Sequence, residues 1–263
     1  MIGSRVKDPK TRFSDRADNY AKYRPGYPVE ILEFLANNRA LTEGSVVADV
    51  GSGTGIVSKL FLENGNRVFA VEPNEGMRRA AEEMLGDYHR FDSVAGAAED
   101  TTLADDSVDL IVAANSLHWA DEAAAKAEFL RVLKSSGQVA ILWNIPRRSG
   151  TPFLENLGRL FSNYRTDGGA GGDAEDVYNI TEKFFKGGSG ERRGFEYGSL
   201  PATQVLDLEG LRGLILSSSS MPTAEEPGAA EMLRDLEEIF HAHESGGEVF
   251  VEYKVSVYCG PLS

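Results

Sequence analysis

A glycine-rich run, GSGTG at residues 51–55, stands between two apolar segments of the sequence. Glycine lets a backbone approach a ligand closely, and the free N–H groups at the start of a following helix can point at that ligand. An acidic residue, Glu72, stands 21 positions after Gly51. A carboxylate at such a spacing can accept hydrogen bonds from both hydroxyls of a ribose. Loop and acid together predict a site for an adenosine-type ligand.

The residue after the glycine run argues against one kind of adenosine site, the site that binds a dinucleotide. The dinucleotide fingerprint G-x-G-x-x-G/A needs a small sixth residue, and this chain has the larger Ile56 there. A short-chain dehydrogenase also needs a tyrosine with a lysine four residues later, and none of the nine tyrosines has that partner. A nicotinamide-dependent oxidoreductase is therefore the weaker alternative.

Alternating strands and helices position these features. Short apolar runs predict buried strands, and amphipathic spacing predicts the helices between them. With right-handed crossovers, the pattern gives an α/β fold with a doubly wound parallel sheet, in which loop and acid lie at the carboxyl ends of neighbouring strands. The predicted strands are residues 46–50, 68–71, 93–95, 109–114, 138–143 and 249–258, and the predicted helices begin near Pro28 or span 56–62, 77–85, 122–133, 153–164, 206–216 and 229–241.

The alternation loosens beyond Trp143. Glycine-rich breaks at 168–172 and 187–190 flank a segment with apolar and aromatic residues, which we interpret as part of a cap or lid. We expect one domain rather than two. Its predicted parts are an N-terminal arm at 1–29, a cofactor-binding core at 30–145, a cap insertion at 146–190 and a C-terminal part of the sheet at 191–263.

Composition argues against several partners. The chain has 41 acidic and 27 basic residues, and a net charge of −14 repels phosphate backbones, so we expect no nucleic-acid partner. One cysteine, Cys259, excludes an intramolecular disulfide and a multi-cysteine metal site, and we expect no metal. There is no secretory signal pattern and no apolar run of about 20 residues, which predicts a cytoplasmic protein without membrane contact.

Residues 1–28 differ in charge from the remainder of the chain. They contain seven basic and three acidic residues, together with Tyr20, Tyr23 and Tyr27. We expect this arm to close over the site once a ligand binds, excluding water. The alternatives are a solvated, partly frayed terminus and, for Tyr27, a packing anchor.

The sequence resembles class I S-adenosylmethionine-dependent methyltransferases, and within them a bacterial "type 11" group related to trans-aconitate methyltransferases. The run DVGSGTG at 49–55 is similar to the first motif of that family. The resemblance runs along the whole chain. It rests further on FSDRA at 13–17, Tyr20, YRPGYP at 23–28, VEPN at 71–74, GAAE at 96–99, NSLHW at 115–119, LWN at 142–144, SSS at 217–219 and a tyrosine-containing final strand.

The resemblance implies S-adenosylmethionine as the cofactor and a seven-stranded sheet whose last strand is antiparallel. It implies that Glu72 binds the ribose, that residues 51–55 hold the methionine end, and that Ala98 and Glu99 lie beside the adenine. Many relatives have an aspartate where this chain has Ala97, so the adenine amine would use Glu99, Asp100, a backbone carbonyl or water. The candidate cofactor-binding residues are Tyr20, Arg24, Asp49, Gly51, Ser52, Gly53, Thr54, Glu72, Pro73, Ala98, Glu99 and Asn115.

A candidate catalytic residue, His118, follows the strand at 109–114 and therefore lies at the edge of the sheet where ligands bind. It either faces the methyl acceptor, as a base or a hydrogen-bond donor, or fixes its loop while Trp119 packs in the core. Tyrosine rings of the arm could cover the positive sulfonium, and Arg24 could reach the cofactor carboxylate or an acidic acceptor.

The sequence thus predicts methyl transfer from S-adenosylmethionine to a small-molecule carboxylate, amine or hydroxyl. A non-catalytic protein that binds S-adenosylmethionine is the alternative from a different functional class. The residues indicate neither the acceptor nor the oligomeric state.

Overall fold

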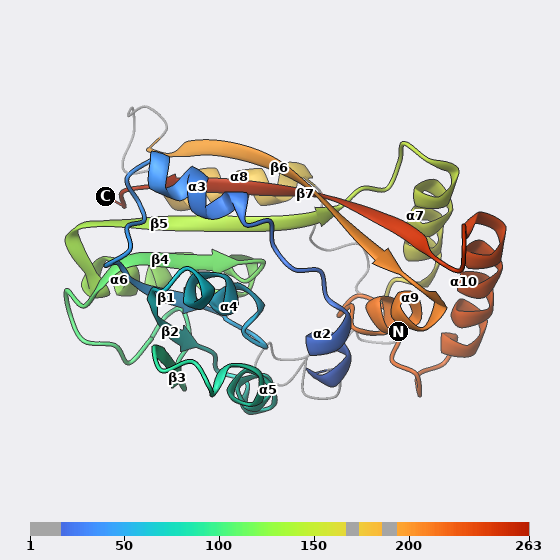
Figure 1. Cartoon of the computed structure of the whole chain (residues 1–263), viewed down its shortest axis with the longest axis horizontal. Coiled ribbons are helices and arrows are strands. Elements are labelled where there is room, and N and C mark those ends of the chain that lie inside the picture. The colour runs from blue at the N-terminus through green and yellow to red at the C-terminus, as the bar shows by residue number, and fades with distance from the viewer. Residues whose placement is uncertain (1–16, 167–173, 186–193, 263) are drawn as a thin grey trace, which may run out of the picture. The chain divides into compact units, whose positions relative to one another are not determined.

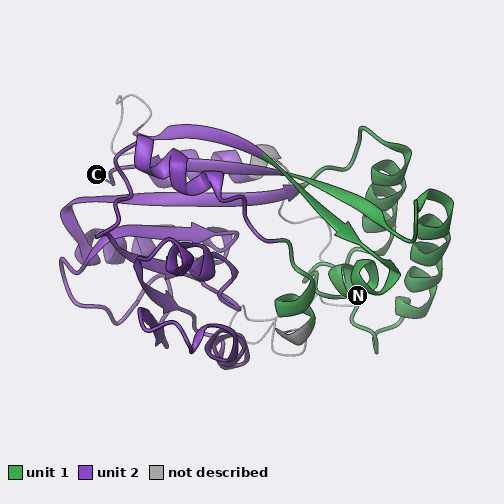
Figure 2. Cartoon of the chain, viewed as in Figure 1, with its two compact units in different colours: residues 1–25, 146–170, 201–253 green, residues 26–145, 171–200, 254–263 purple. Residues whose placement is uncertain are grey.

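The structure, a computed structural model, describes residues 17–166, 174–185 and 194–262. The chain divides into two compact units (Figure 2). Unit 1 consists of residues 1–25, 146–170 and 201–253, and unit 2 of residues 26–145, 171–200 and 254–263. Each unit is thus assembled from segments that are far apart in the sequence.

A seven-stranded sheet has the strand order β3-β2-β1-β4-β5-β7-β6 (Figure 1). Neighbouring strands from β3 to β5 pair in parallel, and β7 runs antiparallel. The predicted doubly wound fold with an antiparallel last strand is therefore confirmed. The strands are β1 (Val46–Val50), β2 (Arg67–Val71), β3 (Phe91–Val94), β4 (Val108–Ala114), β5 (Leu133–Pro146), β6 (Glu196–Leu206) and β7 (Val249–Gly260).

Helices cover both faces of the sheet in unit 2. In Figure 1, α3 and α4 lie in front of the sheet, and α6 and α8 lie behind it. Phe129 of α6 and Phe184 of α8 are fully buried in one core cluster with Ile111 and Ile141 of the strands. The helices of this unit are α3 (Glu30–Asn37), α4 (Ile56–Glu63), α5 (Glu75–Leu85), α6 (Glu122–Val132), α8 (Ala174–Phe185) and the short 3-10 helix η1 (Leu117–Trp119).

Unit 1 has a separate core between helices and the strand segments that belong to it. Leu157 of α7, Leu211 of α9 and Leu236 of α10 are buried there together with Tyr253 of β7. The helices of this unit are α2 (Ala17–Tyr23), α7 (Pro152–Tyr164), α9 (Leu208–Leu216) and α10 (Ala229–His243).

The structure departs from the sequence-based expectations at one strand and within the cap. The sequence interpretation placed no strand at β6, because Gly198 and Pro201 interrupt the alternation of its residues. Proline is tolerated in β6 because this strand lies at the edge of the sheet. The predicted cap divides between the units: residues 146–170 belong to unit 1 and 171–190 to unit 2. Residues 167–173 and 186–190 of this cap lie outside the described residues, and the proposed division into arm, core, cap and C-terminal part stays a prediction.

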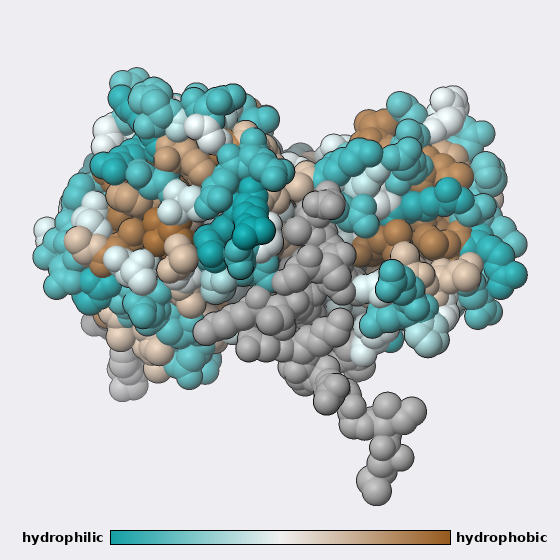
Figure 3. All heavy atoms as spheres, turned by 90° about the horizontal axis from the view of Figure 1, so that it is seen from below, coloured by the Kyte–Doolittle hydropathy of each residue, from teal (hydrophilic) through white to brown (hydrophobic). Residues whose placement is uncertain are grey.

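None of the described helices is long and apolar enough to cross a membrane. Figure 3 shows hydrophilic side chains over much of one face, with apolar side chains between them.

Candidate functional site

The carboxyl end of β1 carries a buried acid. The side chain of Asp49 is fully buried, and its Oδ2 accepts a hydrogen bond from Ser58 Oγ of α4 at 2.6 Å. Its Oδ1 has no hydrogen-bond partner within the described part of the chain. Burial raises the pKa of Asp49 to about 7; the charge of Glu72 adds to this shift, and the bond from Ser58 opposes it.

The glycine run forms a tight loop between β1 and α4. Gly51, Gly53 and Gly55 have φ angles of 72°, 56° and 84°, in the region that favours glycine. A Cβ atom on Gly51 would lie 2.5 Å from Ser116 Cβ, and one on Gly55 would lie 2.6 Å from Leu85 Cδ1. The loop therefore needs glycine both for its backbone conformation and for its close packing.

Two hydroxyl groups of this loop are buried without partners. Neither Ser52 Oγ nor Thr54 Oγ1 has a hydrogen-bond partner in residues 17–166, 174–185 and 194–262. Buried polar atoms normally do have partners. With Asp49 Oδ1, three such atoms fall within residues 49–54, a concentration that fits a ligand with several polar groups.

Glu72 directly follows β2 and ties that strand end to the glycine loop. Its Oε2 accepts from Gly53 N at 2.9 Å, and its Oε1 accepts from Asn74 N at 2.8 Å. Burial raises the pKa of Glu72, while these two N–H donors and the charge of Arg78 oppose the rise. Arg78 Nη1 in turn donates to the carbonyl oxygens of Glu72 and Pro73, at 3.0 Å each. Because each carboxylate oxygen can accept more than one hydrogen bond, Glu72 can also accept from ligand hydroxyls.

The segment expected beside an adenine forms a small closed turn after β3. Ala97 N donates to Asp100 O at 2.9 Å, and Asp100 N donates to Ala97 O at 3.1 Å. Ala98 is half-buried against the core of unit 2. Glu99 Oε1 accepts from the backbone N–H of Asp121, the N-cap residue of α6, at 2.7 Å. One oxygen of Glu99 is thus already bonded within the protein, and the adenine contact of Ala98 and Glu99 stays a prediction.

Asn115 joins the carboxyl ends of β4 and β5. It has a φ of 50°, its Oδ1 accepts from Asn144 N at 3.0 Å, and its Nδ2 donates to Tyr27 Oη at 3.1 Å. The side-chain Nδ2 of Asn144 donates to Gly26 O at 3.3 Å. The last residues of the predicted arm are therefore fixed at these strand ends, and Asn115 has a structural role besides the predicted cofactor contact.

His118 lies in η1, which follows β4 after Asn115 and Ser116, and is exposed. Its imidazole centroid is 4.5 Å from that of Trp119 and 5.6 Å from that of Trp143. The loop is held to β1 by Ser116 Oγ, which donates to Val50 O at 2.8 Å. Trp119, which we expected to pack in the core, is only half-buried. The tryptophan that is buried in the core is Trp143. Whether His118 acts on an acceptor stays a prediction.

Tyr20 and Arg24 lie in unit 1. The Arg24 guanidinium lies over the Tyr20 ring at 4.8 Å, and its Nη2 donates to Ser217 O at the end of α9, at 3.1 Å. Tyr23 Oη donates to Glu209 Oε1 at 2.6 Å. These contacts fix α2 on α9. The cofactor contacts expected of Tyr20 and Arg24 stay predictions, and residues 1–16 of the arm lie outside the described residues.

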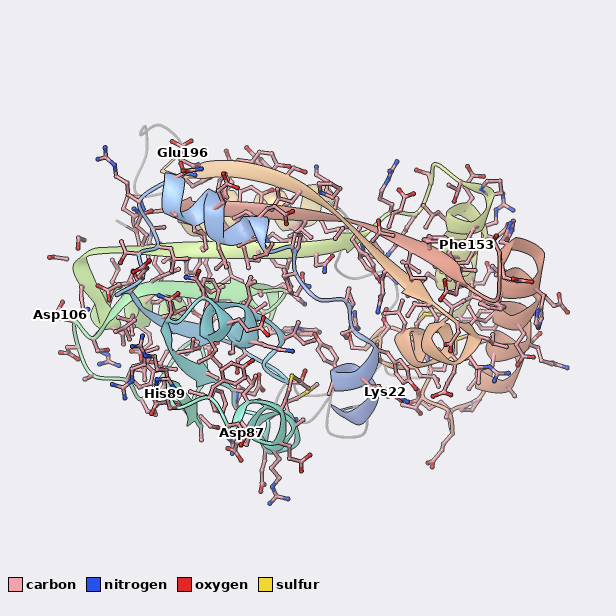
Figure 4. All side chains as sticks on the ribbon, viewed as in Figure 1. Lys22, Asp87, His89, Asp106, Phe153 and Glu196 are labelled. Carbon is pink, nitrogen blue, oxygen red and sulfur yellow. The ribbon has the colours of Figure 1, made fainter. Side chains whose placement is uncertain are left out.

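The structure brings most of the predicted site residues together in unit 2, and it adds residues that the sequence interpretation missed. Arg78, Ser116 and Asn144 each hold part of the site through the bonds and contacts above. Asn144 belongs to the segment LWN that carries the resemblance, which was a usable signal. Ser116 likewise belongs to the segment NSLHW that carries the resemblance, but nothing in the sequence indicated its close approach to Gly51. His89, which was assigned no chemistry, is exposed in the turn before β3 (Figure 4).

Comparison with known proteins agrees with this geometry. Residues 48–141 match the family model for a type 11 methyltransferase domain. A methyltransferase-like protein of Schizosaccharomyces pombe is 28% identical over 233 residues, which is 88% of this chain and 86% of that protein. An uncharacterised methyltransferase of Mycobacterium tuberculosis is 31% identical over 154 residues, which is 59% of this chain and 60% of that protein.

The fold recurs in a solved structure of a type II methyltransferase from Anaeromyxobacter dehalogenans. The TM-score is 0.69 at 22% identity, over 90% of this chain and 97% of that one. The matched family uses S-adenosylmethionine. The unpartnered polar atoms of residues 49–54 and the left-handed glycines fit such a cofactor. Residues 48–141 are therefore a methyltransferase domain of a family that uses S-adenosylmethionine, and the chain has the α/β methyltransferase fold.

Proposed function

We propose that the chain transfers the methyl group of S-adenosylmethionine to a small-molecule acceptor, at a carboxylate, amine or hydroxyl. The assignment of the cofactor is supported above all by three buried polar atoms that have no hydrogen-bond partner among the described residues. They are Asp49 Oδ1, Ser52 Oγ and Thr54 Oγ1. The net charge of −14 supports a small acceptor over a nucleic acid, because a phosphate backbone would be repelled.

In this proposal, different residues of unit 2 bind different parts of the cofactor. Asp49, Ser52 and Thr54 bind the polar methionine end, with the glycines allowing close approach. Glu72 binds the ribose while Gly53 N and Asn74 N hold its carboxylate in place. Pro73, Ala98 and Glu99 lie along the adenine, and Asn115 shapes the edge of the site.

When bound, S-adenosylmethionine would supply a methyl group on a positively charged sulfur; the acceptor lone pair would bond to the methyl carbon as the carbon–sulfur bond breaks, and S-adenosylhomocysteine would leave. The protein contributes mainly proximity, orientation and exclusion of water. His118, exposed after β4, orients the acceptor or removes its proton, and a general base contributes a factor of about 10²–10⁴. A carboxylate acceptor needs no base.

Isothermal titration calorimetry with S-adenosylhomocysteine tests the cofactor assignment. Glu72→Ala should weaken binding by about 1.5–3 kcal/mol, or about 10–150-fold, because it removes hydrogen bonds to a charged group. Glu75→Ala is the matched control, since this exposed acid of α5 pairs with Arg79 on the helix surface. Equal affinity of Glu72→Ala and the unchanged protein would refute the ribose assignment.

Methyl transfer itself is tested with S-adenosylmethionine carrying a labelled methyl group and a panel of small acids, amines and phenols. The expected result is a labelled product together with S-adenosylhomocysteine, with less product from His118→Gln. Tight cofactor binding without transfer to any member of the panel would favour the non-catalytic alternative. Submicromolar, salt-sensitive binding of duplex DNA or RNA would contradict a small-molecule acceptor.

The finer relation to trans-aconitate methyltransferases is also a proposal, and it rests on the segments YRPGYP and NSLHW. It makes small unsaturated carboxylic acids the first acceptors to test. Transfer to amines or phenols but to no carboxylic acid would argue against this relation while leaving the methyltransferase assignment intact.

A further inference from the structure

Both tryptophans of the chain, Trp119 and Trp143, lie beside His118. The ring planes are tilted by 44° and 39° to the imidazole, at centroid distances of 4.5 and 5.6 Å. Aromatic rings attract one another at such distances. Trp143 is 3% exposed, so the exposed imidazole lies against an indole that belongs to the core.

The indole of Trp143 is itself held by α8. Its Nε1 donates to Thr181 Oγ1 at 2.8 Å, and Thr181 Oγ1 donates to the backbone oxygen of Val177 at 2.7 Å. The hydroxyl thus accepts one hydrogen bond and donates another, in a fully buried position. Serine could do the same, whereas valine, with nearly the same shape as threonine, could do neither.

The helix that carries Thr181 is firmly seated. Phe184 is fully buried and contacts Phe129 of α6 edge-on at 5.5 Å, and Phe185 is 3% exposed. Hydrogen bonds and core packing therefore connect His118 to α8 through Trp143. On its other side, the same loop is tied to β1 through Ser116 and Val50.

We propose that Trp143, held by Thr181, is a positioning residue that fixes the plane of the His118 imidazole at the carboxyl edge of the sheet. An exposed histidine without such a support samples several rotamers, and the conformational entropy lost in ordering it at each encounter with an acceptor would slow the reaction. A displacement of about 1 Å in a reacting group can cost 10²-fold in rate. This inference rests on the proposed function, in which His118 contacts the acceptor.

The test compares Thr181→Val with its control Thr181→Ser in the full chain, saturated with S-adenosylhomocysteine. The imidazole resonances of the four histidines are recorded by NMR, and His118→Gln assigns the signal of His118. Ring currents of two indoles should displace this signal from those of the other histidines. Thr181→Val should move it towards the position of a freely rotating histidine, and Thr181→Ser should leave it in place.

The kinetic test uses the acceptor that the labelled-methyl panel identifies. Thr181→Val should lower kcat at least about 10-fold while the KM for S-adenosylmethionine and the S-adenosylhomocysteine affinity stay unchanged. Thr181→Ser should restore kcat. A purely structural role would instead lower the melting temperature with the His118 signal and kcat unchanged, and this result would overturn the proposal.

The outcomes separate this inference from the proposed function. If His118→Gln abolishes transfer while Thr181→Val does not reduce it, the positioning role fails and the function stands. If His118→Gln transfers methyl groups at the unchanged rate, the proposed contact between His118 and the acceptor fails, and the positioning role fails with it.

Discussion

Two regions of the molecule use a glycine for close packing, with different results. In unit 2, Gly51 lies against Ser116; in unit 1, Gly213 of α9 lies against the ring of Tyr23. Around Gly213, Tyr23 Oη donates to Glu209 and Gln204 Nε2 donates to Tyr23 O, at 2.6 and 2.9 Å. Around Gly51, the buried polar atoms of Asp49, Ser52 and Thr54 lack partners among the residues described.

The two close approaches differ in how many of the surrounding polar groups have hydrogen-bond partners. At α2 and α9 the close approach joins two helices, and most polar groups there are bonded, with Arg24 Nε and Arg212 Nε as exceptions within the described chain. At the glycine loop the close approach leaves buried polar atoms unsatisfied, which is costly unless something binds them. The concentration of unpaired polar atoms within residues 49–54, rather than the glycines, therefore distinguishes the proposed cofactor site from the contact between α2 and α9.

The largest effect is expected from Gly51→Ala. It combines a left-handed backbone with a Cβ 2.5 Å from Ser116 Cβ, and it should lower the free energy of unfolding by about 2–5 kcal/mol. Gly65→Ala is the matched control, because its φ is 92° with no atom of the described chain within 4 Å of the new Cβ. It should cost only about 1–2 kcal/mol. Urea unfolding measures both, and equal losses would show that the contact with Ser116 is unimportant.

The second prediction concerns the buried acid. Because the folded pKa of Asp49, about 7, exceeds its ordinary value of 3.8, the folded state holds the Asp49 proton more tightly than the unfolded state does. Asp49 therefore lowers the free energy of unfolding progressively as pH rises from about 4 to 7. The free energy of unfolding of Asp49→Asn should therefore rise relative to that of the unchanged protein as the pH increases. At about 1.4 kcal/mol per pKa unit, the difference between the two proteins should grow by about 2–4 kcal/mol from pH 4 to pH 8.

Urea unfolding of the cofactor-free protein across this range measures that gain. Ser58→Ala serves as the companion variant, because it removes the hydrogen bond that opposes the rise in pKa. It should move the pH dependence to higher pH. A constant stability difference between Asp49→Asn and the unchanged protein from pH 4 to pH 8 would contradict the burial of an ionisable group.

Gly213→Ala tests the completed contact in unit 1. A Cβ there would lie 2.1 Å from Tyr23 Cδ2, so the ring must move, and the expected loss is about 1–3 kcal/mol. In a Tyr23→Ala background the overlap is absent, and alanine should then stabilise α9 by up to about 1 kcal/mol over glycine. Thermal unfolding of the four proteins in this cycle measures the coupling. Additive effects would mean that Tyr23 does not lie on Gly213 in solution.

The smallest effect is expected from Lys22→Ala on α2, the helix that carries Tyr23 (Figure 4). Lys22 Nζ lies 3.0 Å from Glu209 Oε1, and the two side chains are 65% and 73% exposed. Exposed ion pairs contribute little, so the melting temperature should change by no more than about 1 °C. A larger, salt-sensitive change would show that charge, and not the packing of Tyr23 on α9, holds α2 in place.

The sequence was most informative where periodicity was strong. The strand at 46–50, the glycine loop and the helix after it were predicted almost to the residue, because an apolar run followed by GSGTG has few structural alternatives. The strand β6 was missed because Gly198 and Pro201 mask its alternation, and an edge strand needs fewer apolar residues. The apolar residues of α8 were interpreted as a lid, although they are buried in the core of unit 2.

Residue types and spacing by themselves determined the fold class and the loop that would bind an adenosine-type ligand, and the resemblance to a known family added S-adenosylmethionine as the cofactor. These follow from local rules: left-handed turns need glycine, and a parallel sheet brings strand ends together. Only the tertiary structure decided which polar atoms are left without partners, that Glu99 is bonded at the start of α6, and that Trp143 lies between His118 and Thr181. Such contacts join segments dozens of residues apart, and their geometry depends on the packing of whole helices and strands rather than on local sequence.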